Sequence, residues 1–152
     1  MHFLNVIKEL LKESPIELYV DMDGVIASYD AGKPLDFVNK RPLMENIKKL
    51  EEIGKLKDVE LHILSICRKD FQIEEKNQWL EKNAPFFKKE YRTIISKEKM
   101  KDVKSSEIKA NFLKNLKTDK KIVVIDDDNM VIKQICKEVA NAEVFQDSEL
   151  ID

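Results

Sequence analysis

Five short apolar segments alternate with longer amphipathic segments, and this alternation constrains the fold more than any other feature of the chain. The apolar segments are the expected strands, and they cover residues 16–20, 59–65, 92–96, 121–125 and 142–146. The amphipathic segments are the expected helices, and they cover residues 42–53, 71–83, 105–116 and 129–140. Because a parallel crossover needs a helix to return the chain to the same edge, the pattern predicts an α/β fold. The predicted fold is a doubly wound, parallel five-stranded sheet with helices on both faces.

The length of the chain, 152 residues, is near the usual size of one domain, so residues 1–152 are expected to form a single unit. The first segment, residues 1–14, predicts an amphipathic helix over residues 2–13, which Pro15 ends. Residues 27–41 contain turn residues but too few apolar residues for a folded domain. We expect them to form a flap, so that any cap over the sheet is minimal.

The charge of the chain is nearly balanced, with 27 Lys and Arg against 29 Asp and Glu. This balance does not indicate bulk attraction to nucleic acid. Locally, residues 88–104 hold seven Lys or Arg against three Asp or Glu, an excess that an anionic substrate could use. Cys67 and Cys136 are too few for a disulfide framework, and no segment has the ~20 apolar residues of a membrane helix. A cytoplasmic protein without a membrane partner is therefore expected.

Two of the expected strands end in acidic residues. Asp21 and Asp23 follow the first strand, and Asp126 and Asp127 follow the fourth. The carboxyl ends of parallel strands meet at one edge of the sheet, where such folds bind ligands. Carboxylates crowded there repel one another unless a cation or protons neutralise them, and a hard divalent cation suits a set of oxygen ligands. The sequence therefore predicts a metal site, and Mg2+ is the expected cofactor.

The sequence DMDG suits attack on phosphorus by a carboxylate. Asp21 would be the nucleophile, while Asp23 would protonate the leaving oxygen and later take a proton from the attacking water. Gly24 can adopt positive φ, which allows the chain to turn sharply after the two acids. Asp128 and Asn129 fit a different role, because they would cap the following helix and leave the preceding acids for the cation.

A hydroxyl and a lysine complete the expected site. Ser65 closes the second expected strand, where its hydroxyl and the backbone N–H of Ile66 could hold a phosphoryl oxygen, and Arg68 could contact an anionic substrate. Lys104 immediately precedes the expected helix over residues 105–116 and could bind phosphate there. Two other lysines of the same basic segment are alternatives, namely Lys97 and Lys99.

Taken in order, these motifs resemble those of the haloacid dehalogenase-like superfamily. The four motifs are DMDGV, the apolar run ending in Ser65, a lysine that opens the next helix, and IVVIDDD, and the similarity spans residues 16 to about 132. The resemblance implies a Rossmann-type fold and a Mg2+-dependent phosphohydrolase. It implies that the nucleophile is Asp21, the general acid/base Asp23, the phosphate-holding residues Ser65 and Lys104, and the metal-binding residues Asp21, Asp23 (through its carbonyl), Asp126 and Asp127.

Within this resemblance, an acid at position 23 favours phosphatase over dehalogenase chemistry, through an aspartyl-phosphate intermediate. The lysine motif lacks the proline that usually follows it, and the segments that usually carry a cap are very short. An open site would admit substrates as large as a nucleic-acid end, although the charge of the chain does not indicate one. The segment KNQWLEKNAPFF is similar to small nucleotidases of the superfamily, so a nucleotide monophosphate is the first expected substrate.

Two other classes of protein remain alternatives to an enzyme. Receiver-like signalling domains also combine acids, a hydroxyl and a lysine with Mg2+ on a parallel sheet. Their order along the chain differs, however, because the lysine follows all the acids, whereas here it precedes Asp126 and Asp127. A non-catalytic binding protein could also keep such a site, but the intact Asp23 argues against that alternative.

Overall fold

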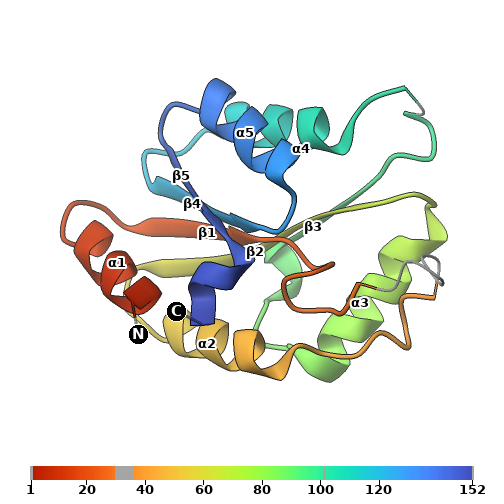
Figure 1. The fold of residues 1–152 in the computed structure, drawn as a ribbon, viewed down its shortest axis with the longest axis horizontal. Coiled ribbons are helices and arrows are strands. Elements are labelled where there is room, and N and C mark those ends of the chain that lie inside the picture. The colour runs from red at the N-terminus through yellow and green to blue at the C-terminus, as the bar shows by residue number, and fades with distance from the viewer. Residues whose placement is uncertain (1, 30–35, 101, 152) are drawn as a thin grey trace.

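The computed structural model describes residues 2–29, 36–100 and 102–151, and it has the predicted α/β architecture (Figure 1). All strand pairs are parallel, and the order across the sheet is β3-β2-β1-β4-β5. The strands are β1 (Ile16–Val20), β2 (Val59–Cys67), β3 (Arg92–Ser96), β4 (Lys121–Asp126) and β5 (Ala142–Gln146). The first strand is thus central, with β2 on one side and β4 on the other.

Helices cover both faces of the sheet, with α4 and α5 on one face and α1, α2 and α3 on the other (Figure 1). The helices are α1 (His2–Leu11), α2 (Met44–Gly54), α3 (Phe71–Asn83), α4 (Ser105–Lys114) and α5 (Asn129–Glu138), with short 3-10 turns η1 (Lys89–Tyr91) and η2 (Asp147–Ile151). Every predicted strand and helix is present, with ends within two residues of the prediction. Within the part of the chain that the structure describes, no helix has the length and apolar character to cross a membrane.

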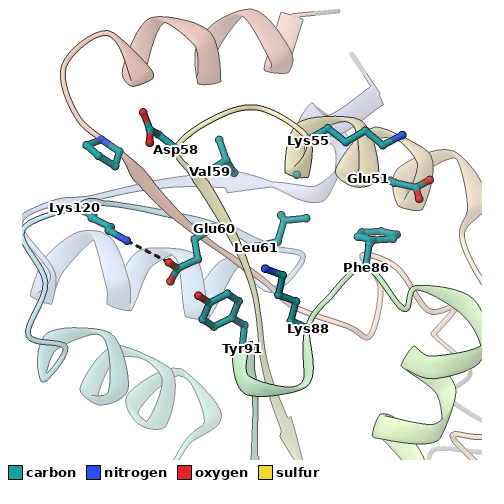
Figure 2. Close-up of a pocket in the computed structure, with 12 residues that line it drawn as sticks. Glu51, Lys55, Asp58, Val59, Glu60, Leu61, Phe86, Lys88, Tyr91 and Lys120 are labelled. Carbon is teal, nitrogen blue, oxygen red and sulfur yellow. Dashed lines mark hydrogen bonds and ion pairs between the residues drawn. The ribbon is translucent and has the colours of Figure 1, made fainter.

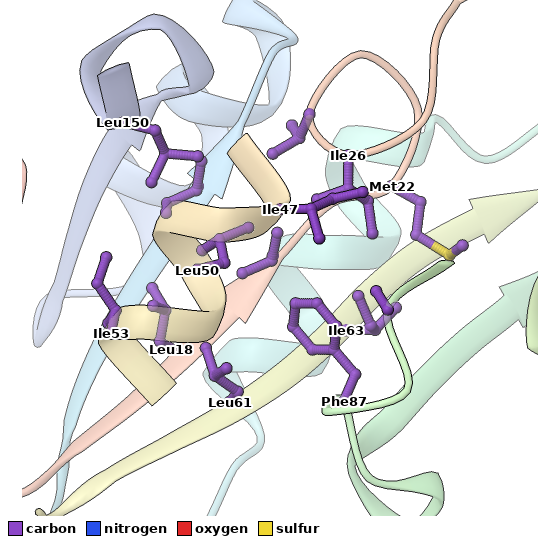
Figure 3. Close-up of a cluster of buried hydrophobic side chains, with 14 of the residues drawn as sticks. Leu18, Met22, Ile26, Ile47, Leu50, Ile53, Leu61, Ile63, Phe87 and Leu150 are labelled. Carbon is purple, nitrogen blue, oxygen red and sulfur yellow. The ribbon is translucent and has the colours of Figure 1, made fainter. Parts of the chain in front are cut away.

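The core is divided by the sheet because alternate residues of a strand face opposite sides. Leu18 of β1 packs with Leu50 of α2 and with other apolar side chains of that layer (Figure 3). The next residue, Tyr19, faces the other layer and packs with Leu113 of α4 and Ile135 of α5. All five residues of β1 are buried, as expected for a central strand covered on both faces.

The prediction that a strand ends at Ser65 is wrong by two residues. The parallel pairing of β2 with β3 continues through Ile66, opposite Ile95, and through Cys67, opposite Ser96. Ser65 is therefore fully buried inside β2 rather than placed at its tip. The carboxyl end of β2 reaches further toward solvent than the sequence indicated.

Candidate active site

The carboxyl ends of β1 and β4 lie side by side at the centre of the sheet. Val20 and Ile125 are paired across the two strands, and the backbone N–H of Asp21 donates to the carbonyl of Ile125 at 3.0 Å. Asp126 is the last residue of β4, so it emerges next to Asp21. This is the point where the strand order reverses, which in open α/β sheets is the usual position of a ligand site.

Three carboxylates meet at this point and form what we call the acidic cluster: Asp21, Asp126 and Asp127. Each offers one oxygen atom, and these atoms all lie within 4.8 Å of one another. Asp21 and Asp126 are buried, while Asp127 is more open to solvent. The oxygen-only set of ligands suits Mg2+ or another hard divalent cation, which would offset the repulsion between the carboxylates.

Lys109 of α4 lies against the same carboxylates. Its Nζ is 3.0 Å from Oδ1 of Asp21 and 2.6 Å from Oδ2 of Asp126. Burial alone would lower the pKa of Lys109, but the two carboxylates raise it above its ordinary value. Asp21 keeps its second oxygen, and Oδ1 of Asp126 accepts from the N–H of Asp128 at 3.0 Å but retains a lone pair, so contact with Lys109 and contact with a cation are compatible.

Two of the three carboxylates in the acidic cluster have raised pKa values in the metal-free protein. Burial raises the pKa of Asp21 to about 8, although Lys109 opposes this shift. Partial burial and the neighbouring Asp126 raise the pKa of Asp127 to about 6. A cation bound between the carboxylates would favour their ionised forms and would release the protons.

Gly24 makes the close packing of the two acidic segments possible. Its φ is +80°, as the sequence DMDG predicted, and its N–H donates to the carbonyl of Ala27 at 2.8 Å in the turn that follows β1. A Cβ at this position would lie 1.9 Å from Oδ2 of Asp127. Glycine is therefore required both for the turn and for the approach of Asp127.

Asp23 points away from the acidic cluster and contacts two lysines instead. Its Oδ1 is 2.6 Å from Nζ of Lys40, and its Oδ2 is 3.3 Å from Nζ of Lys76. The side chain of Asp23 remains 31% exposed, so it can reach a ligand, whereas both lysines are buried. We call these two lysines, Lys40 and Lys76, the positively charged wall. Asp23 thus lies between the acidic cluster and this wall.

Lys76 of α3 connects this wall to β2. Its Nζ donates to Oγ of Ser65 at 2.6 Å and to the carbonyl of Ile66 at 3.0 Å. The side chain is 1% exposed, and its charge lies 4.9 Å from the ring centroid of Phe37. A buried ammonium beside a hydroxyl and a carboxylate is suited to hold a phosphoryl oxygen.

The structure does not bring Lys104 to the position for which the sequence analysis chose it. Lys104 is exposed and precedes α4 as its N-terminal capping residue. Among the described residues, the lysine that contacts Asp21 is Lys109, more than one helical turn further along α4. Within the described part of the chain, the alternatives Lys97 and Lys99 form no ion pair with Asp21 either, and both follow β3 at the edge of the sheet.

Both lysines that the sequence analysis missed carry a recognisable signal. Lys76 lies three residues before Trp79, and Lys109 lies four residues before Leu113, so each shares the buried side of its helix with a core residue. A lysine in the apolar stripe of a helix is unusual because burial penalises its charge. This position in the helical pattern, rather than nearness to a helix start, identifies the two residues.

The flap expected over residues 27–41 includes residues 30–35, which lie outside the described part of the chain. Its described ends are fixed to the body of the protein. Ala27 forms an antiparallel bridge with Pro42, and the indole Nε1 of Trp79 donates to the carbonyl of Lys40 at 2.9 Å. These contacts hold Lys40 next to Asp23.

Two cavities, of which the first is lined by Asp23, share three lining residues: Ile66, Cys67 and Arg68. The first, called the small cavity, has a volume of about 120 Å3 and is also lined by Asp23, Lys40 and Lys76. The second, called the basic cavity, has a volume of about 480 Å3 and is also lined by Lys69, Lys97, Glu98 and Ser105. Both lie at the carboxyl ends of β2 and β3.

A further cavity of about 450 Å3 lies at the amino ends of the strands, where Figure 2 shows Glu60 paired with Lys120. Glu60, Glu17 and His62 also bring ligand atoms within 4.8 Å of one another. These groups already have partners within the protein, because His62 contacts Glu60 at 2.7 Å and Glu17 accepts from Tyr19 at 2.7 Å. None of the residues predicted from the sequence to form the active site lies in this cavity.

Comparison with known proteins supports the fold. No protein-family model matches the chain, and no curated protein matches it. Solved structures with a similar fold include the Pnkp1/Rnl/Hen1 complex (TM-score 0.69, 16% identity) and the Pnkp1/Rnl/Hen1 RNA repair complex (TM-score 0.68, 17% identity). Both matches cover 88% of this chain but only 46% and 42% of the matched chains, so this chain spans less than half of their length.

Proposed function

We propose that this chain is a Mg2+-dependent phosphatase that hydrolyses a phosphate monoester through an aspartyl-phosphate on Asp21, as members of the haloacid dehalogenase-like superfamily do. The observation that carries the proposal is the position of Asp21 and Asp23. Asp21 belongs to the acidic cluster, while Asp23 faces a small cavity lined by lysines. A phosphoryl group between them would meet a nucleophile, a metal ion and cationic donors together.

Four residues have separate roles in the proposed reaction, namely Asp21, Asp23, Lys76 and Ser65. The carboxylate of Asp21 attacks phosphorus, and the bond between phosphorus and the ester oxygen breaks as Asp23 donates a proton to that oxygen. Asp23 then takes a proton from a water molecule, which attacks phosphorus, releases phosphate and restores Asp21. Lys76, held by Ser65, would contact the phosphoryl oxygens, where its charge stabilises the transition state.

Mg2+ held by the acidic cluster would offset negative charge on the phosphoryl oxygens and would keep Asp21 ionised for attack. Lys109 would orient Asp21 and Asp126 for these tasks, because it contacts one oxygen of each. The carbonyl of Asp23 is the fourth protein ligand that the family resemblance assigns.

The substrate we propose is a phosphorylated nucleoside or nucleic-acid end. The sequence favoured a nucleotide monophosphate through its similarity to small nucleotidases. The solved structures with a similar fold come from an RNA repair complex, which adds weight to a nucleic-acid end. The minimal cap that the sequence predicts is compatible with both.

Hydrolysis of an aryl phosphate tests the proposed reaction. Purified protein should release phosphate with Mg2+ and lose activity with a chelator, and Asp21→Asn should abolish turnover while Asp119→Asn, an exposed loop position, should not. Undiminished activity in Asp21→Asn would remove the proposed nucleophile. An aspartyl-phosphate that persists for minutes without turnover would instead support the receiver-like alternative.

A further inference from the structure

We propose that the basic cavity is a second phosphate-binding subsite, which holds an additional phosphate of the substrate while the small cavity holds the phosphate to be removed. This inference rests on the proposed function for the identity of the first phosphate. The residues that would bind the second phosphate are Arg68, Lys69 and Lys97. The chemical class of ligand is a phosphate monoester with another phosphate on the same molecule.

The small cavity and the basic cavity adjoin each other, because they share three lining residues. Ile66, Cys67 and Arg68 contribute to both, so a ligand that leaves the small cavity along this wall enters the basic cavity. The small cavity, at about 120 Å3, has room for a phosphoryl group but not for a whole nucleotide. The basic cavity, at about 480 Å3, provides the volume for the rest of the substrate.

The charge of the basic cavity favours an anion. Its lining includes three cationic side chains and one acidic side chain, Glu98. Lys69 approaches Glu98 only to 3.9 Å, and both groups are substantially exposed, so this ion pair is weak. Over the ranges 2–29, 36–100 and 102–151, neither Arg68 nor Lys97 forms an ion pair, which leaves their charges free for a ligand.

The backbone that presents these cations is held in place. The side chain of Gln72 is buried, and its Oε1 accepts hydrogen bonds from the N–H groups of Arg68 and Lys69, both at 3.1 Å. The N–H of Lys97 donates to the carbonyl of Cys67 at 2.9 Å, which joins the two sides of the cavity. These contacts fix the backbone positions from which the three cationic side chains extend.

The start of α4 adds to the positive potential. Ser105, the first residue of this ten-residue helix, lines the basic cavity. No side chain caps the helix, and the helix dipole favours an anion at this end, although the acidic Glu107 of the first turn opposes it. The N–H of Glu107 already donates to the carbonyl of Lys104, which leaves the N–H groups before it for a ligand. The volume of the basic cavity, its cationic side chains and the start of α4 therefore all favour binding of an anion.

The end of a nucleic-acid strand and a nucleoside bisphosphate both carry the required second phosphate. A binding experiment distinguishes these two kinds of ligand. Binding is measured by competition against a fluorescent nucleotide with the full chain in chelator, so that no turnover is needed. Thymidine 5′-monophosphate and thymidine 3′-monophosphate are compared with their one-nucleotide extensions and with thymidine 3′,5′-bisphosphate. Tighter binding of only the extended ligands identifies a strand end, and tighter binding of the bisphosphate as well shows that any second phosphate is enough.

We expect the two-phosphate ligands to bind about tenfold more tightly than the monophosphates at low salt, a preference that should shrink as salt is added. Lys97→Gln and Arg68→Gln should each remove most of this preference, whereas Lys48→Gln, an exposed position on α2, should keep it. Equal binding of one-phosphate and two-phosphate ligands, or a full preference in Lys97→Gln, would overturn the subsite. Because binding is measured without catalysis, an inactive protein would refute the proposed function but would leave this test intact.

Discussion

Replacing Lys76 by methionine is the sharpest test of the proposed contact between phosphate and the positively charged wall, because it removes the charge and keeps most of the side-chain length. The Nζ of Lys76 lies 2.6 Å from Oγ of Ser65, 3.0 Å from the carbonyl of Ile66 and 3.3 Å from Asp23. In the proposed reaction, at least one of these interactions is exchanged for a phosphoryl oxygen. The loss should therefore appear in catalysis.

The size of the effect follows from the kind of contact. A hydrogen bond to a charged group contributes about 1.5–3 kcal/mol, which corresponds to a fall of about 10- to 150-fold in kcat/KM. Lys40 still pairs with Asp23 in the variant, so the general acid/base is not left without a cation. We also expect unfolding free energy to fall by about 1–3 kcal/mol, because the buried hydroxyl of Ser65 loses its donor.

The assay compares kcat and KM for an aryl phosphate in wild type, Lys76→Met and Lys82→Met. Lys82 is an exposed residue of the same helix, so its substitution controls for the loss of charge and for the effect of methionine on the helix. Urea denaturation of all three proteins checks that the kinetics refer to folded molecules. If Lys76→Met stays within about twofold of Lys82→Met, phosphate is not held by Lys76 and the reasoning from its contacts fails.

Three other predictions concern the acidic cluster. In the metal-free protein, the pKa values of Asp21 (about 8) and Asp127 (about 6) are raised above the ordinary value of 3.8, so the folded state keeps protons that the unfolded chain releases. The unfolding free energy should therefore fall as the pH rises from about 4 to about 8. Over the upper part of that range the apparent Mg2+ affinity should rise about tenfold per pH unit in calorimetric titrations, and a pH-independent affinity would contradict the shift. Gly24→Ala should lower unfolding free energy by about 1–3 kcal/mol in urea denaturation and weaken Mg2+ binding, since the new Cβ would displace Asp127. Lys109→Met should cost about 3–5 kcal/mol in urea denaturation because it leaves Asp21 and Asp126 without their cation, and Mg2+ should restore part of this loss; an equal loss with and without Mg2+ would argue against a metal site there.

The sequence predicted the fold well because each of its signals is local. Apolar runs and helical periodicity depend on neighbouring residues, and the alternation of the two leaves few arrangements for the sheet. The same holds for the cap of α5, where the side chain of Asp128 accepts from the N–H of Met130 at 2.8 Å, as its position before the helix predicted. The end of β2 was missed because it depends on pairing with β3, which is not a local property.

The proximity of the acids follows from the strand ends, whereas the lysine that contacts them depends on helix packing. A residue at the carboxyl end of a central strand must reach the ligand edge, so Asp21 and Asp126 could be placed together without coordinates. Which lysine reaches them depends on how a helix is rotated and how far along the sheet it packs. Lys104 immediately precedes α4, but the packing of α4 on the sheet directs Lys109, and not Lys104, toward Asp21.

The lysines divide the site into two electrostatic halves. Lys109 contacts the acidic cluster from the α4 layer, while Lys76 reaches Asp23 from the α3 layer on the opposite face of the sheet. Lys40, on the loop before α2, lies on the same side as Lys76. In the proposed function, Lys109 leaves the acidic cluster negative enough to bind a divalent ion, and Lys40 and Lys76 give Asp23 surroundings that attract phosphate. Because the two groups of lysines come from opposite layers, a substitution in α3 should change phosphate binding while it leaves Mg2+ affinity nearly unaltered, and the reverse should hold for α4.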